Sequence, residues 1–334
     1  MLQPHFKDDR DVAQAISQAR VKIRSELSKR IIGQSVVIED LLACLLAGGH
    51  CLLVGVPGLA KTTLVRSIAK TLALDFSRIQ FTPDLMPSDI TGSEILFEDR
   101  ATGTREFRFV KGPVFANVLL ADEINRTPPK TQSALLQAME EHEVTAAGKT
   151  YPLPSPFWVL ATQNPIEQEG TYPLPEAQQD RFMFSVELDY PSHAEELEII
   201  TKTTSPVTGE IVPVVSAQEV VAFREFLLKV PVAKSIVEAA VTLVRRSRPN
   251  DPECSPDIKP LLTWGAGPRA AHFLVLAAKA YAVLDSRPTP DVADLRRAAH
   301  QVLRHRLVRS FHAEAENVSV NEIVGKLVGS VLKG

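Results

Sequence analysis

Short apolar runs alternate with helical patterns in the first half of the chain. Five of these runs have the length of a strand: Cys51–Val54, Phe76–Phe81, Val118–Ala121, Phe157–Thr162 and Phe182–Leu188. Three of them are uninterrupted, as expected for parallel strands that helices cover on both faces. Strands that alternate with helices in this way predict a doubly wound α/β domain.

Apolar spacing and cap residues mark the helices between the strands. Thr62–Leu72 carries leucine or isoleucine at every fourth position, which gives the helix one apolar face. Thr127–Glu141 begins with Thr127 as the expected N-cap and Pro128 in the first turn. We expect both helices to pack against the sheet.

Two β-hairpins are predicted as insertions into this pattern. The first pairs Ile95–Phe97 with Arg105–Val110 across a turn at residues 99–103, and the second runs from Val144 to Leu153 and turns near Gly148.

The pattern becomes almost entirely helical after Asp189-Tyr190-Pro191-Ser192. Helices are expected at Ala194–Thr203, Glu219–Leu228, Lys234–Arg246, Pro268–Ala282 and Pro290–Arg309. We therefore divide the chain into an N-terminal helical segment (1–29), an α/β core (30–189) and an α-helical domain (192–334).

Composition restricts the classes of function. Among 334 residues the net charge is −3, which offers no electrostatic footprint for nucleic acid, so no stable nucleic-acid partner is expected. The three cysteines stand far apart without a CxxC spacing, which excludes a disulfide framework and a thiolate zinc site and fits a reducing cytoplasm. The N-terminus has no signal-peptide core, and the most apolar stretch is interrupted by Gly48-Gly49-His50. We expect a cytoplasmic protein without membrane insertion.

A loop of small residues follows the first strand and precedes a helix: Gly55-Val56-Pro57-Gly58-Leu59-Ala60-Lys61-Thr62. This is the context of a phosphate-binding loop, in which backbone N–H groups turn inward onto phosphate oxygens and the helix N-terminus adds a positive dipole. Lys61 can reach the β and γ phosphates, and the Thr62 hydroxyl can ligate Mg²⁺. The residues assigned to ATP binding are Val56, Pro57, Gly58, Leu59, Ala60, Lys61, Thr62 and Thr63.

Ala60 stands where the pattern GxxxxGK[ST] has its last glycine. Alanine is tolerated there if the residue has helical dihedral angles, because only a positive φ demands glycine. Alanine therefore suits this position on the condition that Ala60 is helical.

Two further strands carry polar residues to the sheet edge where ligands bind. The run from Asn117 ends in Asp122 and Glu123. Asp122 can hold Mg²⁺ through water, and Glu123 can polarise a water molecule for in-line attack on the γ phosphate. The run from Phe157 ends in Gln163-Asn164-Pro165, where the Asn164 amide could orient that water. The alternative for Asn164 is a simple Asn-Pro turn.

Four ordered segments resemble the signatures of MoxR-type AAA+ ATPases, in a match from Ile32-Gly33-Gln34 to the C-terminal helices. They are Gly55–Thr62, Ala121-Asp122-Glu123-Ile124-Asn125-Arg126-Thr127-Pro128-Pro129-Lys130, Ala161-Thr162-Gln163-Asn164-Pro165 and Leu174-Pro175-Glu176-Ala177-Gln178-Gln179-Asp180-Arg181-Phe182. The resemblance implies a P-loop NTPase (AAA+) parallel-sheet core with a C-terminal α-helical lid domain. It also implies that the first predicted hairpin is the helix-2 insert of this branch and that the second is the hairpin before sensor 1.

The resemblance also implies roles for single residues. It assigns Lys61 and Thr62 to the Walker A motif and Asp122 and Glu123 to the Walker B motif. It assigns Asn164 to the sensor 1 position. It makes Arg181 an arginine finger for the neighbouring subunit's nucleotide, Arg269 sensor 2, and Gly33 and Gln34 neighbours of the adenine.

Each arginine has an alternative. Arg181 follows Asp180 and could form a surface ion pair, and Arg126, close to Walker B, is a rival for the role between subunits. Arg269 opens a helix, where a cation opposes the helix dipole. That placement suggests an anionic partner, although a salt bridge would also explain it. Whether Arg269 acts in its own subunit or the next stays open.

Two other clusters are interpreted as ordinary surface. Glu140-Glu141-His142-Glu143 is expected to be a solvated helix end and not a metal site. Arg304-His305-Arg306 with Arg309 is expected to be a basic helix face.

The resemblance implies an ATP- and Mg²⁺-dependent ATPase that forms a homo-oligomer, a hexameric ring, and acts as a chaperone-like motor on client proteins, including von Willebrand factor A domain proteins. A DNA-acting AAA+ module (helicase or transcription activator) is the alternative. The net charge opposes it, and so does the missing Gly-Ala-Phe-Thr-Gly-Ala loop between Phe81 and Gly112. A nucleotide-gated scaffold that barely hydrolyses ATP is a third hypothesis.

Overall fold

A five-stranded parallel sheet forms the centre of the computed structural model, which describes residues 6–98, 104–146, 148–166, 170–205 and 209–332. The strand order is β2-β5-β8-β1-β9. The strands are β1 (Cys51–Val54), β2 (Phe76–Gln80), β5 (Val118–Asp122), β8 (Trp158–Gln163) and β9 (Phe184–Glu187). The five predicted strands and the parallel α/β core are confirmed.

Helices cover both faces of the sheet, and the alternation of side chains along β5 shows how. Val118 and Leu120 pack in one apolar cluster with α1 (Asp9–Leu27), α2 (Ser35–Leu46) and α3 (Lys61–Thr71). Leu119 and Ala121 point to the opposite face and pack in a second cluster with α5 (Pro129–Glu141). An uninterrupted apolar strand is needed because both faces are buried.

The predicted N-cap at Thr127 is wrong. A 3₁₀ turn, η1 (Ile124–Arg126), precedes α5, Thr127 is buried with extended dihedral angles, and Pro128 takes the N-cap position. The two consecutive prolines explain the difference, because a residue before proline is disfavoured in the helical region.

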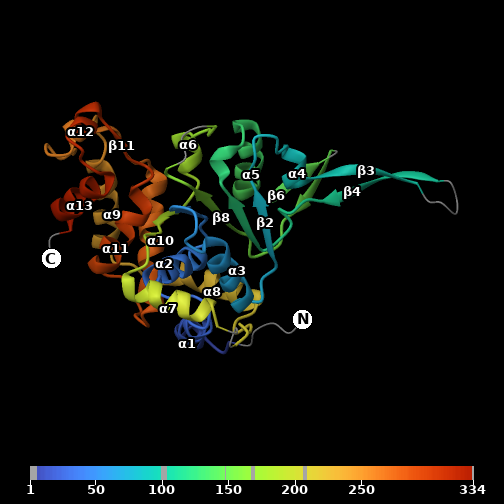
Figure 1. Cartoon of the computed structure of the whole chain (residues 1–334). Coiled ribbons are helices and arrows are strands. Elements are labelled where there is room, and N and C mark those ends of the chain that lie inside the picture. The colour runs from blue at the N-terminus through green and yellow to red at the C-terminus, as the bar shows by residue number, and fades with distance from the viewer. Residues whose placement is uncertain (1–5, 99–103, 147, 167–169, 206–208, 333–334) are drawn as a thin grey trace.

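Both predicted hairpins are present. The first consists of β3 (Gly92–Glu98) and β4 (Arg105–Lys111) and projects from the body as an arm (Figure 1). The turn predicted at residues 99–103 lies outside the described ranges. The second consists of β6 (Glu143–Ala146) and β7 (Lys149–Pro152). Phe109 stacks on Tyr151 at 4.3 Å between ring centroids, so the base of the arm rests on the second hairpin. A short helix, α4 (Pro87–Thr91), leads into the arm.

The second half is helical, with differences at its C-terminal end. After α6 (Glu176–Gln179), the helices are α7 (His193–Thr203), α8 (Ala217–Lys229), α9 (Lys234–Arg246), α10 (Pro268–Leu284), α11 (Val292–Leu303), α12 (Phe311–Ala315) and α13 (Val320–Val331). The predicted helix Pro290–Arg309 is too long. After α11, Arg309 belongs to β11 (Val308–Arg309), which pairs with β10 (Leu262–Trp264) after η2 (Lys259–Leu261). The domain boundaries drawn from the sequence stay a prediction.

The basic segment after α11 is not a helix face. Arg306 is 5% exposed and donates to the backbone carbonyls of Asp180 and Phe182 and to the Asp180 carboxylate at 2.7 Å. Burial lowers the pKa of Arg306 to about 10, which leaves it charged at neutral pH. Arg304 pairs with Glu187 at 2.7 Å. These hydrogen bonds and ion pairs therefore connect the helical region to the sheet.

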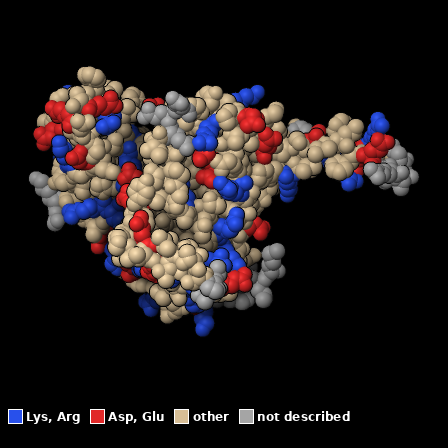
Figure 2. All heavy atoms as spheres, in the orientation of Figure 1, with Lys and Arg blue, Asp and Glu red and all other residues tan. Residues whose placement is uncertain are grey.

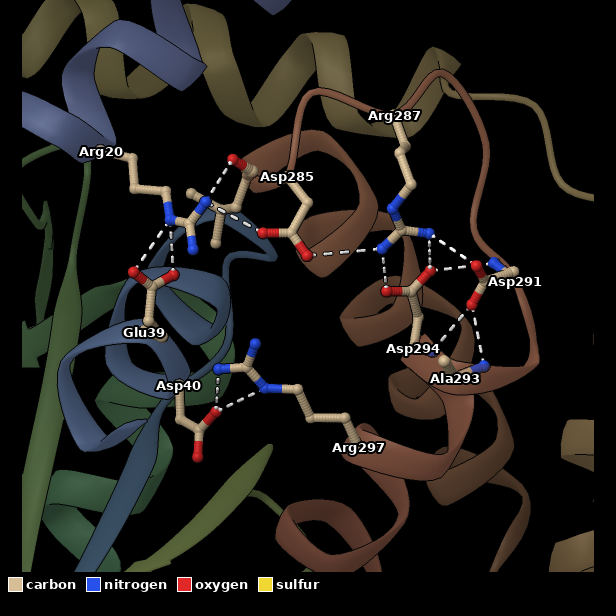
Figure 3. A network of polar contacts seen from close by, with 10 residues as sticks. Arg20, Glu39, Asp40, Asp285, Arg287, Asp291, Ala293, Asp294 and Arg297 are labelled. Carbon is tan, nitrogen blue, oxygen red and sulfur yellow. Dashed lines mark hydrogen bonds and ion pairs between the residues drawn. The ribbon is translucent and has the colours of Figure 1, made fainter. Parts of the chain in front are cut away.

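A polar network joins the first two helices to α10 and α11 (Figure 3). Asp40 in α2 is 1% exposed, and its carboxylate accepts hydrogen bonds from Tyr281, Arg297 and Gln301. Nearby, Arg20 bridges Glu39 and Asp285 at 2.8 and 2.9 Å. Buried carboxylates persist when they are paired and hydrogen-bonded.

Cys44, Cys51 and Cys254 are free thiols. None of the described helices is long and apolar enough to cross a bilayer. Within the same ranges, no group of three or more His, Cys, Asp or Glu side chains is arranged to hold a metal ion.

Candidate active site

The phosphate loop and the ends of two neighbouring strands surround one pocket of about 350 Å³. Its lining combines the loop and the start of α3 with the carboxyl ends of β5 and β8: Pro57, Gly58, Leu59, Ala60, Lys61, Thr62, Thr63, Asp122, Glu123, Thr162 and Asn164. This is the ligand-binding edge of a parallel sheet. The structure therefore brings together most of the residues assigned to nucleotide from sequence, while Val56 lies outside the lining.

The condition stated for alanine at position 60 is not met, because the φ of Ala60 is 54° and its ψ is 25°, in the left-handed region. Gly58 also has a positive φ, of 90°. Such turns point successive backbone N–H groups into a concavity that binds anions. The loop thus needs the left-handed conformation that glycine supplies in the usual pattern, and Ala60 adopts it at a cost of about 1–2 kcal/mol.

Ala60→Gly should therefore raise the free energy of unfolding by about 1 kcal/mol and change nucleotide affinity less than about threefold. Denaturant titration and nucleotide titration would measure the two quantities. Ala194→Gly is the matched control, because Ala194 is exposed in the right-handed helix α7 and its replacement should destabilise the protein. A loss of stability in Ala60→Gly would contradict this account of the loop.

Lys61 begins α3, where the helix N-terminus faces the loop. Its ammonium donates hydrogen bonds to the backbone carbonyls of Gly55 and Val56, the latter at 3.3 Å. The charge of Lys61 thus lies over the loop, within the pocket that it lines. Thr62 and Thr63 follow in the first turn and share this lining.

Asp122 is held by two side chains that sequence reasoning missed. The Thr162 hydroxyl donates to Asp122 Oδ1 at 2.6 Å, and Arg78 pairs with Oδ2 at 2.6 Å. Thr162 is the polar residue just before Gln163-Asn164, which could have marked it. Arg78 lies on β2, and its role depends on the β2–β5 pairing, for which the local sequence holds no signal.

Glu123 occupies a strained position beside Asp122. Its φ is 57° and its ψ is 50°, and its backbone N–H donates to the same Thr162 hydroxyl at 2.8 Å. Its carboxylate accepts from Gln80 at 2.5 Å and pairs with Arg126 at 3.1 Å. Left-handed non-glycine residues cluster at functional sites. Arg126, the rival arginine, contacts Walker B of its own chain.

Asn164 makes the contact of an Asn-Pro turn and also lines the pocket. Its Oδ1 accepts a hydrogen bond from Ile166 N at 3.3 Å, as in an Asn-Pro turn. Its Nδ2 is buried without a hydrogen-bond partner among the described residues, and the side chain lines the pocket. A buried unpaired donor costs about 1–3 kcal/mol, which a phosphate oxygen or a water molecule in the pocket would recover. This orphaned amide fits a bound nucleotide.

Gly33 and Gln34 lie at the margin of the phosphate loop and not in the pocket lining. Gln34 Nε2 donates to the Leu59 carbonyl at 3.3 Å. Gly33 has a φ of 66°, and a Cβ there would lie 2.2 Å from Oε1 of Glu195. Since the Glu195 carboxylate is the end of a flexible side chain, it is the positive φ that favours glycine here. The adenine role stays a prediction.

Arg181 and Arg269 lie together, outside the lining of their own chain's pocket. Arg181 Nη2 pairs with Glu140 Oε2 at 2.9 Å, and Arg269 Nη2 pairs with Glu140 Oε1 at 3.2 Å. Arg269 also approaches Asp180 at 3.6 Å. Glu140 is half-exposed, as expected for a helix end, but the sequence did not reveal that it joins the two arginines.

Comparisons with known proteins agree with this geometry. Residues 50–184 match the family model described as "ATPase family associated with various cellular activities (AAA)", and residues 256–327 match an AAA lid domain. Chaperone MoxR1 of Mycobacterium tuberculosis is 42% identical over 92% of this chain and 80% of its own. Protein MoxR of Methylorubrum extorquens is 30% identical over 86% of this chain and 87% of its own.

A crystal structure supports the same assignment. It is of a protein from Cytophaga hutchinsonii, provisionally described as an ATPase, and it superposes with a TM-score of 0.87 at 42% identity, covering 95% of this chain and 96% of that one. Identity and coverage of this extent, with the phosphate loop and both carboxylates at one sheet edge, identify the family. The chain belongs to the MoxR family of AAA+ ATPases.

Proposed function

We propose that this chain hydrolyses ATP in the phosphate-loop pocket, with the arginines of a neighbouring subunit completing the site. The proposal is supported by one observation: within a single chain, the two arginines lie apart from the pocket that they would complete. The pocket holds Lys61, Asp122 and Glu123, whereas Arg181 and Arg269 meet at Glu140, outside its lining.

ATP would bind through the backbone N–H groups of the loop and the Lys61 ammonium. Thr62 and Asp122 would hold Mg²⁺, Asp122 through water because Arg78 and Thr162 already engage its oxygens. Two protein groups suffice, since Mg²⁺ keeps several waters and takes few carboxylates. When bound, the ion offsets the negative charge of the β and γ phosphates.

Glu123 would accept the proton of the attacking water, and Asn164 would orient that water with its unpaired Nδ2. Both side chains line the pocket beside the phosphate loop. Thr162 would keep the two Walker B residues in place, because its single hydroxyl contacts both Asp122 and Glu123.

Arg181 and Arg269 would stabilise the charge of the transferring phosphoryl group in the neighbouring subunit. Their common contact with Glu140 supports a shared role between subunits. Arg126 suits this role less well, because it pairs with Glu123 of its own chain.

A head-to-tail contact of this kind generates a ring if the rotation closes, and we propose a homo-oligomeric, hexameric ring. One surface helix supports assembly. Helix α7 has no buried residue and exposes Leu197 and Ile200 by 57% and 61%. An 11-residue helix is marginal without tertiary packing, so a neighbouring subunit would cover it.

We further propose a cytoplasmic, chaperone-like motor that remodels client proteins, including von Willebrand factor A domain proteins. The name of the mycobacterial relative, Chaperone MoxR1, supports the chaperone role, and three free cysteines suit a reducing compartment. The arm is a candidate client contact, since Leu96 and Phe107 are exposed on it. The DNA-acting alternative is not favoured. The face shown in Figure 2 carries interspersed acidic and basic side chains and not a continuous basic surface.

Mixing two inactive variants tests the shared site. Arg181→Ala and Glu123→Gln should each lose ATPase activity alone. In mixed oligomers, some interfaces would join an intact Glu123 to an intact Arg181, so activity should partly return. Confirmed mixed oligomers that stay at background would overturn the role of Arg181 between subunits.

A further inference from the structure

Glu140 lies where three separate parts of the chain meet. It belongs to the last turn of α5, Arg181 follows α6, and Arg269 lies in the first turn of α10. Each carboxylate oxygen takes one arginine, with Oε2 2.9 Å from Arg181 Nη2 and Oε1 3.2 Å from Arg269 Nη2. One side chain thus connects an arginine of the sheet domain with an arginine of the helical region.

The position of Glu140 opposes local preference. A carboxylate in the last turn of a helix faces the negative end of the helix dipole, which is unfavourable by about 0.3–1 kcal/mol. No basic residue lies in the last turn of α5 to offset it. The two arginines supply that compensation from distant parts of the sequence.

The local charges leave Glu140 as the main counter-ion of this pair. Asp180, the second carboxylate of the cluster, is engaged by the buried Arg306 at 2.7 Å, and its contact with Arg269 is longer, at 3.6 Å. Three guanidinium groups (Arg181, Arg269, Arg306) therefore meet two carboxylates (Glu140, Asp180). The cluster carries one net positive charge, which suits an anionic ligand.

We propose that Glu140 is a positioning residue, whose carboxylate holds Arg181 and Arg269 side by side so that both reach the γ phosphate of the neighbouring subunit. This inference rests on the proposed function. Two guanidinium groups about 4 Å apart repel each other by about 1–4 kcal/mol, depending on exposure. A carboxylate between them removes that repulsion and fixes both orientations.

The arrangement leaves donors available to the ligand. Arg181 contacts Glu140 through Nη2, and a guanidinium has five N–H donors in a fixed fork. It can therefore bind Glu140 and a phosphate oxygen at the same time. Both arginine side chains are partly exposed, at 31% and 40%, so a ligand from outside the chain can reach them.

Glu140→Gln tests the proposal, because it keeps the shape of the side chain and removes its charge. We expect kcat for ATP hydrolysis to fall about 10- to 100-fold, as for a small misplacement of a catalytic group, with KM and oligomer size unchanged. Glu141→Gln is the matched control. Glu141 is the next residue of α5, is exposed and accepts a hydrogen bond from Gln137, so its replacement should leave kcat unchanged.

Two further measurements separate positioning from a structural role. Adding Glu140→Gln to Arg181→Ala should lower kcat by much less than it does in the wild type, because residues that act as a unit are not additive. Mixed oligomers of Glu140→Gln and Glu123→Gln subunits should recover activity, since some interfaces would have intact arginine positioning opposite an intact Glu123.

The outcomes distinguish this inference from the proposed function. Wild-type kcat in Glu140→Gln, with Arg181→Ala inactive, would overturn the inference alone. Loss of folding or assembly in Glu140→Gln would assign Glu140 a structural role and also overturn it. Normal activity in Arg181→Ala would instead overturn the proposed role of the arginine.

Discussion

Replacing Glu123 with glutamine is expected to lower kcat for ATP hydrolysis by a factor of about 10²–10⁴ while ATP binding persists. Glutamine keeps the shape of the side chain and can still accept the hydrogen bond from Gln80. It cannot accept a proton from water. Single-turnover hydrolysis and nucleotide titration would measure the two effects separately. The ATP-bound variant should also form a more stable oligomer, because the retained γ phosphate would connect neighbouring subunits.

Glu225→Gln provides the control for this experiment, since Glu225 is exposed on α8 and lies outside the pocket. It should hydrolyse ATP at the wild-type rate. Rapid turnover by Glu123→Gln would mean that another group activates the water, and the assignment of Glu123 would fail.

Lys61→Ala should abolish ATP binding at ordinary nucleotide concentrations while the fold persists. Removing one partner of a buried charge pair costs about 3–5 kcal/mol, which corresponds to a loss of affinity of about 10²–10³-fold or more. Calorimetric titration would measure the affinity, and circular dichroism would verify the fold. In the loop, the Lys61 ammonium donates hydrogen bonds to the backbone carbonyls of Gly55 and Val56.

Lys70→Ala is the corresponding control, because Lys70 lies in the last turn of the same helix and pairs with the exposed Glu210. The affinity of the Lys70→Ala protein for ATP should match that of the wild type. Near-normal ATP affinity in a folded Lys61→Ala protein would contradict the assignment of this loop to phosphate binding.

The features that the sequence predicted well depend on local patterns. The boundaries of β1 and α9 match the prediction, because uninterrupted apolar runs and regular helical spacing are visible in the residues themselves. The pocket followed from the same logic. Strand ends in a parallel sheet meet at one edge, so Asp122, Glu123 and Asn164 were expected beside the phosphate loop, and they line the same pocket.

The features that the sequence did not reveal depend on contacts between distant residues. Arg78 acts on Asp122 only because β2 pairs with β5. Glu140 meets Arg269 across 129 positions of the chain. The left-handed conformation of Ala60 is set by the loop as a whole and overrides the preference of alanine. Helix α11 ends at Leu303, and Arg306 beyond it donates to the carbonyl of Phe182 near β9, a contact that the local sequence does not show.

Because of the network around Asp40, we expect the lid and the sheet domain to unfold together. Removing α10 and α11 would strip Tyr281, Arg297 and Gln301 from a carboxylate that is 1% exposed. An uncompensated buried charge costs about 3–5 kcal/mol, a large part of the usual margin of about 5–15 kcal/mol. A truncated chain that lacks α10 and α11 but keeps the whole phosphate loop is therefore expected to be much less stable than the full chain.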